Sequence, residues 1–529
     1  MNSFSDRIKA LFWGAFFKLS LINWTLFRLR FVLGIKEKTL KKASGIRAAA
    51  AYRQALQVPA YREFLEKNQC HPTQFSDLPV TSKYDYIQPY LKQQRESALY
   101  LNGTIPLKSK RDTSTGTTGK STPWYRGQKE QSHVEKMSAL AGKVALHNQP
   151  YTFVNGFAEG PWVTGISATL ATCHDPNGAI CVIGPVNKEI YACIKELIRI
   201  RPPGHPIVVG GYPPHIRAVV DMAVEEGFPL HEHTLIGLVG GEAMSEDLRD
   251  LIVCQKGRTG FKQCYSSYGA SDLDINIGYE SDFEIELRKL CHDLKHKELA
   301  DELFGKNAFE PMIFRYDPLN YYIETDEEQN LLFTCVRLDR ISPRIRYNLE
   351  DRGKIMAYSD VSAILKKRDI KMSQKSQTNW PFLFVWGRQG SQISFRGSKV
   401  APENLGEAIR LLGIAAKIEH YGFYQYETKD GKTVTEILLE FHDDKDVVSA
   451  DKRLLKDILG RMAEVNSDFV EAIDKCPDNE KPVLRIFRSG EGPMGMQQKK
   501  YPMRKQQYIF VAGDEFIPQQ GKLQTLYEG

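Results

Sequence analysis

Residues 112–123 read DTSTGTTGKSTP, a run of small hydroxyl side chains that contains two glycines and one lysine. Backbone N–H groups, hydroxyls and a lysine ammonium are the donors with which proteins surround phosphate oxygens. The stretch therefore predicts a loop that binds the phosphates of a nucleotide. The residues predicted to hold these phosphates are Ser114, Thr115, Gly116, Thr117, Thr118, Gly119 and Lys120.

A Walker-type phosphate loop, G-x-x-x-x-G-K-[ST], is the main alternative for this stretch. Residues 119–121 fit its end, but Ser114 stands where the first glycine is required. That motif also opens a helix whose N-terminus faces the phosphates. Residues 123–125 (PWY) follow at once and predict a strand. The sequence therefore argues against a Walker-type nucleotidase.

Downstream of the loop, short apolar runs alternate with helical patterns. Residues 207–211 (IVVGG) precede a helix predicted over 214–226. Residues 235–239 precede a helix predicted over 245–255, with Ser245 as its N-cap. Strands that alternate with helices indicate an α/β core.

The remaining parts of the chain complete a two-domain prediction. Residues 39–100 indicate helices, 313–354 a strand-rich section, and 386–390 (WGRQG) a linker. A smaller α+β module follows. Its helices are predicted near 402–412 and 449–465, and its strands near 433–441 and 482–488. The predicted parts are a basic segment over 1–40, a large α/β domain over 41–387 and a small α+β domain over 388–529.

Further motifs follow the loop and, with it, carry a family resemblance. They are Gly240-Gly241-Glu242, Tyr268-Gly269-Ala270-Ser271-Asp272, Arg346-Tyr347-Asn348-Leu349-Glu350-Asp351 and Gly387-Arg388. In order and approximate spacing they resemble the motifs of the adenylate-forming superfamily. Residues 58–62 (VPAYR) and 78–83 (LPVTSK) are similar to pieces of its phenylacetate–CoA ligase and CapK-like branch. The resemblance covers about residues 50–510.

This resemblance implies a fold and a set of roles. The expected fold is α/β: a large N-terminal domain of sheets sandwiched with helices, plus a small, mobile α+β C-terminal domain. The loop would hold the triphosphate of ATP, Tyr268 would stack on adenine, and Asp351 would accept the ribose hydroxyls. Gly241, Glu242, Gly269 and Arg388 complete the expected nucleotide site. Asp272 would hold Mg²⁺, with Glu242 as a second candidate ligand.

The catalytic lysines implied by the resemblance are Lys120 and Lys505. Lys505 lies in residues 503–509 (MRKQQYI), which lack the usual glycine-lysine pair, so Lys499 and Lys500 stay as rivals. The alternative is that all three C-terminal lysines are solvated surface side chains. Asp272 also replaces the usual glutamate of its motif, and residues 389–390 replace an acid that commonly follows "G-R".

The expected reaction joins a carboxylic acid to AMP with release of pyrophosphate, then transfers the acyl group to CoA. Alternatives stay open: transfer to an amine, a carrier protein or a cofactor, or a partner protein whose site has decayed. The branch implies an aryl acid, whereas the N-terminal segment favours a fatty acid. Nothing in the sequence indicates a nucleic-acid partner.

Charge is unevenly distributed along the chain. Residues 1–53 carry eleven Lys/Arg against two Asp/Glu, a net +9 that leaves −3 for the rest of a chain whose total is +6. Within residues 8–34, basic side chains alternate with aromatic ones. This pattern predicts either a helix lying on an anionic membrane surface or a helix packed on the enzyme body. Charged residues interrupt the run, which argues against a transmembrane span. Nine scattered cysteines favour free thiols in a reducing cytoplasm.

Overall fold

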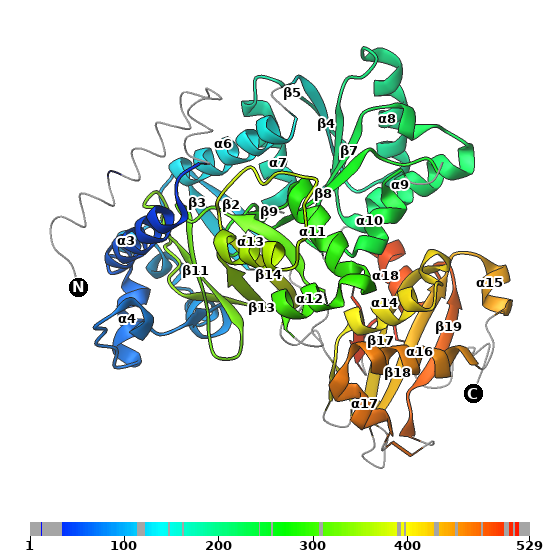
Figure 1. The fold of residues 1–529 in the computed structure, drawn as a ribbon. Coiled ribbons are helices and arrows are strands. Elements are labelled where there is room, and N and C mark those ends of the chain that lie inside the picture. The colour runs from blue at the N-terminus through cyan, green and yellow to red at the C-terminus, as the bar shows by residue number, and fades with distance from the viewer. Residues whose placement is uncertain are drawn as a thin grey trace. The chain divides into compact units, whose positions relative to one another are not determined.

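The computed structural model forms two compact units (Figure 1). The large unit comprises Met1–Leu299 and Pro311–Trp386, and the small unit comprises Ala300–Glu310 and Gly387–Gly529. The structure describes residues 12, 34–113, 122–146, 149–160, 163–242, 244–254, 258–305, 310–388, 393–395, 398–427, 433–449, 453–474, 476–477, 480–501, 507–511 and 514–517.

One half of the large unit's sheet is parallel. Its order is β5 (Gly178–Val182), β4 (Tyr151–Asn155), β6 (Ile207–Gly211), β7 (Leu235–Gly240) and β8 (Gln263–Tyr268). The helices that connect or flank these strands are α6 (Gln128–Ala145), α7 (Val163–His174), α8 (Asn187–Ile200), α9 (Pro213–Glu226) and α10 (Glu246–Ile252). The predicted alternation of strands and helices is confirmed.

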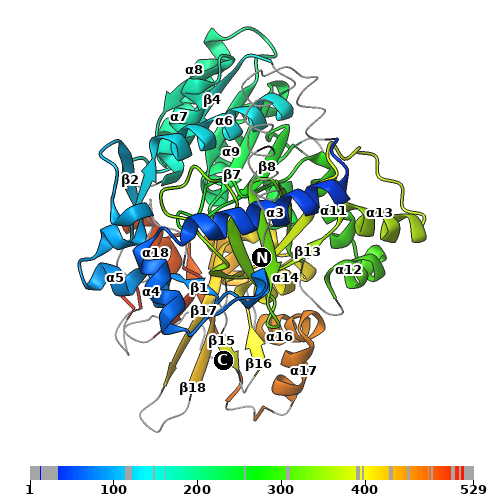
Figure 2. The same cartoon turned by 90° about the vertical axis from the view of Figure 1, so that its left-hand side faces the viewer.

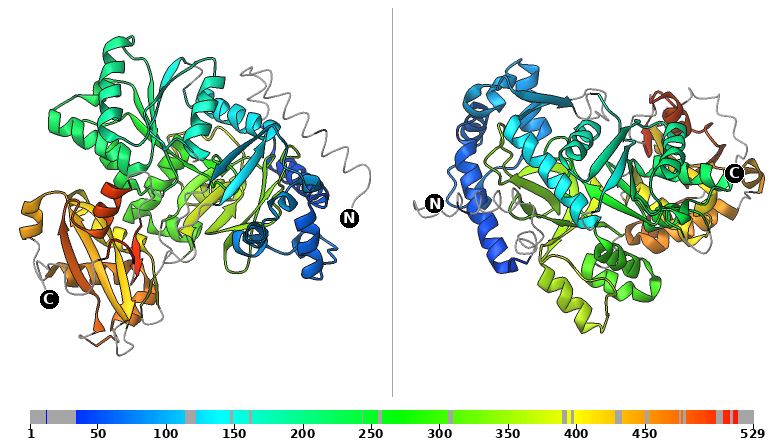
Figure 3. Two further views of the ribbon diagram at one scale, coloured as in Figure 1. Left: turned by 180° about the vertical axis from the view of Figure 1, so that it is seen from behind. Right: turned by 90° about the horizontal axis from the view of Figure 1, so that it is seen from above.

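Helices cover both faces of this parallel half (Figures 1 and 3), and β4 and β6 are buried throughout, whereas the edge strand β5 is not. Phe153 and Val208 face a cluster that includes Ala168 of α7, whereas Val154 and Val209 face the core with α8 and α9. Consecutive strand residues point to opposite faces, so a strand covered on both sides is apolar throughout. Ser245 caps α10 through Leu248 N–H at 3.1 Å, as predicted, but α10 ends at Ile252 instead of 255.

The other half of the sheet is mainly antiparallel. It continues from β8 through β9 (Gly278–Tyr279), β10 (Met312–Tyr316), β14 (Phe382–Arg388), β13 (Tyr347–Met356), β12 (Asn330–Cys335) and β11 (Tyr321–Thr325). These strands confirm the predicted strand-rich section. Because β14 runs to Arg388, the linker predicted over 386–390 is wrong for its first residues, which are strand.

Helices precede the sheet in the chain. They include α3 (Glu37–Ala55), which packs against β11 and β12 (Figure 2), α4 (Pro59–Lys67) and α5 (Gln88–Lys92). Next come β2 (Ser109–Thr113) and β3 (Pro123–Gly127), an antiparallel pair in which Thr113 lies opposite Pro123. A strand therefore follows the predicted phosphate loop, which confirms the argument against a Walker-type loop.

The small unit is an α+β sandwich of its own. Its sheet order is β19 (Val483–Arg488), β18 (Thr433–Phe441), β17 (Ile418–Glu427) and β20 (Ile509–Val511). The helices α14 (Pro402–Leu411), α16 (Arg453–Val465) and α17 (Ser467–Asp474) bury one face, and α18 (Pro493–Lys500) buries Met494 against the other. The predicted α+β module is confirmed, although β17 was not predicted.

Searching the described residues finds no helix that is both long enough and apolar enough to cross a membrane. The segment predicted to contact a membrane, residues 8–34, lies outside the described residues except for Phe12 and Gly34. That prediction therefore stays a prediction.

Candidate active site

Two of the predicted motifs meet at the carboxyl edge of the parallel strands. β7 and β8 run side by side with Gly240 opposite Ser267, so residues 241–242 and 268–269 leave neighbouring strands at the same edge. Gly241 has a φ of +82°, a left-handed conformation that favours glycine where the chain turns off the strand. In open α/β sheets, ligands bind outside this edge.

Tyr268 and Asp351, predicted to contact the adenine and the ribose of one nucleotide, are brought together. The Tyr268 hydroxyl donates to Asp351 Oδ2 at 2.5 Å, across 83 positions of sequence. Asp351 lies on β13 and is buried. The Tyr268 ring is tilted against Phe314 and Phe333, with centroids 5.9 and 6.1 Å away. The two motifs, distant in sequence, are therefore in direct contact in the structure.

Asp272, the predicted Mg²⁺ ligand, lies in the turn after Tyr268. Its Oδ2 accepts a hydrogen bond from the Tyr347 hydroxyl at 2.8 Å, and Ser271 Oγ lies 3.4 Å from its Oδ1. Burial, and then Asp272 itself, raise the pKa of Tyr347 well above its usual value, so Tyr347 stays a donor. Carboxylate and hydroxyl oxygens are the donor type that Mg²⁺ prefers. The oxygen atoms that this turn presents are therefore of the kind that binds Mg²⁺.

Glu242 lies near the neighbouring strand end. Burial, with a smaller contribution from Glu242, raises the pKa of Tyr212 to about 12. Tyr212 directly follows β6, and its ring packs edge-on against Phe157, which follows β4. An acidic side chain and two aromatic rings therefore gather at the same carboxyl edge.

Comparison with known proteins gives no sequence match: no protein-family model and no curated protein matches this chain. Solved structures do match. A crystal structure of 2-hydroxyisobutyryl-CoA ligase in the postadenylation state with R3-HIB-AMP has a TM-score of 0.59 at 11% identity, covering 85% of this chain and 86% of that chain. This chain therefore shares the fold of that ligase.

Two further structures of the same ligase agree. Its open conformation with 2-HIB-AMP and CoA has a TM-score of 0.54 at 12% identity, covering 86% of this chain and 90% of that chain. Its thioesterification state with the same two ligands has a TM-score of 0.50 at 12% identity, covering 86% of this chain and 88% of that chain. The predicted fold class is thus confirmed, on identities too low to carry more than the fold.

Within this shared fold, Arg126 on β3 links the base of the predicted triphosphate loop to the turn after Tyr268. Its Nε donates to Asp112 Oδ2 at 2.7 Å, on the strand that enters the loop. Its Nη1 and Nη2 donate to the carbonyls of Leu273 and Ser271 at 2.7 and 2.5 Å. Sequence reasoning missed Arg126, for which the available signal was an acid and a base on the two strands that flank the loop.

A buried charge cluster lies behind this link. Asp274 accepts from the Tyr321 hydroxyl at 2.6 Å, from Arg337 at 2.9 Å and from Arg340 at 3.1 Å. Burial favours the neutral carboxyl, but Arg337, Arg340 and Arg126 outweigh burial and hold the pKa of Asp274 below its usual value. Asp274 therefore stays ionised and tied to its neighbours.

Several predicted site residues lie outside the described residues. They are Ser114, Thr115, Gly116, Thr117, Thr118, Gly119, Lys120 and Lys505. Arg388 ends β14, and its side chain lies outside the description as well. The rival lysines are exposed within the small unit: Lys499 Nζ donates to the Gly490 carbonyl at 3.0 Å, and Lys500 pairs with Glu515.

Proposed function

We propose that the chain is an AMP-forming acid–CoA ligase. It would join a carboxylic acid to the α-phosphate of ATP, release pyrophosphate, and transfer the acyl group from acyl-AMP to CoA. The observation that carries this proposal is the Tyr268–Asp351 contact beside Gly241 and Glu242, at the carboxyl edge of a sheet with the adenylate-forming fold. The similar ligase, by its own description, binds an acyl-AMP and CoA.

Asp351 and Tyr268 would hold the nucleoside. An ionised carboxylate only accepts hydrogen bonds, so Asp351 suits the two donors of a ribose. It already accepts from one hydroxyl, that of Tyr268, which has the same donor chemistry as a ribose hydroxyl. The Tyr268 ring lies against Phe314 and Phe333, and adenine would extend this aromatic group.

The phosphates of ATP would be held by the predicted triphosphate loop and by Mg²⁺. Residues 114–120 would supply backbone, hydroxyl and Lys120 donors, with Arg126 fixing the strands at the base of the loop. Asp272 would hold Mg²⁺, with Glu242 as a further candidate. When bound, Mg²⁺ neutralises phosphate charge and so favours the approach of a carboxylate anion.

The small unit would supply Lys505 to the reacting carboxylate and Arg388 to the nucleotide. We further propose the boundaries 1–40, 41–387 and 388–529, and a phenylacetate–CoA ligase-like choice of an aryl acid. The two motifs at residues 58–62 and 78–83 support this branch. Transfer to an amine or a carrier protein would share the first step and differ only in the acceptor.

Product analysis tests the proposal. Purified chain is incubated with ATP, Mg²⁺, CoA and a panel of aryl and fatty acids, and nucleotides and thioesters are measured by mass spectrometry. We expect AMP and one acyl-CoA to form in equal amounts, only with the correct acid. AMP formed without thioester would indicate another acceptor, and ADP as the product, or no acid-dependent AMP across the panel, would contradict the proposal.

A further inference from the structure

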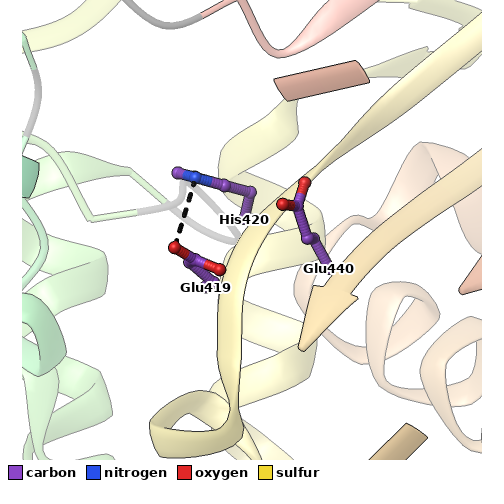
Figure 4. Close-up of side chains that lie close together, drawn as sticks. All are labelled: Glu419, His420 and Glu440. Carbon is purple, nitrogen blue, oxygen red and sulfur yellow. Dashed lines mark ion pairs between the residues drawn. The ribbon is translucent and has the colours of Figure 1, made fainter. Parts of the chain in front are cut away.

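The small unit gathers three potential metal ligands that belong to none of the predicted motifs. Glu419 and His420 on β17 and Glu440 on β18 each offer one ligand atom, and these atoms all lie within 4.8 Å of one another. Figure 4 shows Glu440 facing the other two side chains from the neighbouring strand. Among the described residues, this is the one group of three or more His, Cys, Asp or Glu side chains whose atoms lie close enough together to hold a metal ion.

A β-bulge brings two consecutive residues of β17 to this point. The strand pairing steps from Ile418 opposite Phe441 to His420 opposite Glu440, so Glu419 is an extra residue on β17. In a regular strand, neighbouring side chains point to opposite faces. A bulge breaks this alternation and re-aims a side chain, which is why bulges are common beside functional sites.

The Glu440 carboxylate is oriented by a glycine-rich turn. It accepts hydrogen bonds from the N–H of Gly490 and, at 3.1 Å, from the N–H of Gly495 at the start of α18. A Cβ on Gly492 would lie 2.6 Å from Glu440 Oε2, so side chains are excluded where the carboxylate sits. Such outer hydrogen bonds are what fixes carboxylate ligands around metals.

The charges of this group call for a cation. Glu440 is fully buried and forms no ion pair with a described Lys or Arg; the exposed Lys499 on α18 acts on its charge without pairing with it. Glu436, on the same face of β18, is by contrast paired with Arg485, whose Nη2 donates at 2.6 Å. Glu419 Oε2 is also buried and accepts no hydrogen bond from the described residues. Buried carboxylates need a compensating charge.

We infer that Glu419, His420 and Glu440 form a binding site for one divalent first-row transition-metal ion such as Zn²⁺. Imidazole nitrogen with two carboxylates suits these ions, whereas Mg²⁺ and Ca²⁺ take oxygen ligands. His420 Nε2 and Glu419 Oε1 lie 4.0 Å apart, which is an ion-pair distance when the imidazole is protonated but too long for a hydrogen bond (Figure 4). Two ligands at about 2.1 Å from one ion lie at most about 4.2 Å apart, so this pair can share an ion, whereas any pair of the group that is near 4.8 Å apart would have to move closer when the ion binds.

The bound ion would join β17, β18 and, through Glu440, the turn that starts α18. This inference stands independently of the proposed ligase activity. It predicts that the metal stabilises the small unit, because an ion that binds only the folded chain raises its stability.

Metal titration of the full-length chain tests the site. The protein is stripped with a chelator, dialysed, and titrated with Zn²⁺ in competition with a chromogenic chelator. We expect Glu419→Gln and His420→Gln each to weaken the site more than about 100-fold, beyond the 10–100-fold typical of outer-shell changes. The matched controls Glu464→Gln and His231→Gln, both exposed, should bind like wild type.

Two further readouts separate this site from the nine cysteines. Co²⁺ should give weak visible bands without a thiolate charge-transfer band, and Zn²⁺ should raise the thermal midpoint of wild type but not of Glu419→Gln. Glu419 does not hold α18, so this variant should fold. Equal Zn²⁺ affinity in wild type and both variants, or a thiolate spectrum at the tight site, would overturn the inference.

Discussion

Two groups of carboxylates in the large unit differ in what holds them. Asp274 is held by two arginines, Arg337 and Arg340 at 2.9 and 3.1 Å, in addition to the Tyr321 hydroxyl at 2.6 Å. Asp351 and Asp272 also accept from tyrosine hydroxyls, at 2.5 and 2.8 Å, and in these two contacts the donor is a hydroxyl without a guanidinium beside it. A guanidinium pair in the interior is difficult to exchange, whereas a hydroxyl is the same kind of donor that a ribose or a metal-bound water presents. The first group suits structure and the second suits ligands.

Among these variants, Asp274→Ala should have the largest effect, which is a loss of folding stability. It leaves three buried arginines without their shared carboxylate, and breaking a buried ion pair costs about 3–5 kcal/mol. Thermal unfolding followed by circular dichroism should show a clear fall in the midpoint, with activity lost along with the fold. Asp360→Asn, an exposed acid on α13 (Tyr358–Lys367), is the control. An unchanged unfolding midpoint for Asp274→Ala would contradict the claim that the buried pairs of Asp274 with arginines stabilise the fold.

Asp351→Ala should do the opposite, sparing the fold and reducing acid-dependent AMP formation. Losing a charged hydrogen-bond partner costs about 1.5–3 kcal/mol, or about 10- to 150-fold. Lys120→Ala, in the predicted triphosphate loop, should act similarly. Wild-type rates in both variants, with ATP near its KM, would contradict the assigned nucleotide site.

Lys505→Ala should separate the two half-reactions. Adenylate formation should fall by about 10- to 150-fold, because a charged donor to the reacting anions is lost. Transfer from a supplied acyl-AMP to CoA should stay near wild type. If the first step is unchanged, the role passes to Lys500 or Lys499. If none of the three lysines matters, the small unit does not contribute a lysine.

Gln389→Pro tests the predicted hinge at residues 387–390. Proline fixes φ and so would favour one backbone conformation. Scored on each half-reaction separately, the variant should impair one step more than the other. Equal loss of both steps would argue against a hinge at this position.

Tyr268→Phe should give the smallest effect. It removes one hydroxyl donor to Asp351 and keeps the ring, so a loss of about 0.5–1.5 kcal/mol, or about 2- to 10-fold in ATP affinity, is expected. Binding of ATP measured by calorimetry is the readout. A loss as large as that of Asp351→Ala would mean that the hydroxyl contributes as much to ATP binding as the carboxylate, contrary to this expectation.

The sequence predicted the α/β and α+β units, because hydrophobic periodicity and capping signals are local. It also predicted residues 241–242, 268–269 and 351 as one site, through a family resemblance whose fold is confirmed. It missed Asp274, since buried pairs between distant positions leave no local pattern. It also missed Arg126, whose only signal was an acid and a base on the two strands that flank the loop. Glu419 and His420 were missed for another reason: only the bulge in β17 points both side chains one way. The linker predicted over 386–390 was wrong for residues 386–388, which are strand, because glycine in β14 resembles a break. The division between the two units nevertheless falls between Trp386 and Gly387.

Exchange of labelled pyrophosphate into ATP, measured without CoA, tests the central claim most directly. The exchange reports reversible acyl-adenylate formation at the site that contains Tyr268 and Asp351. We expect exchange that depends on one class of carboxylic acid, is strongly reduced in Asp351→Ala, and is retained in Asp360→Asn. Exchange that is absent with every acid, or that is equal in wild type and folded Asp351→Ala, would contradict it.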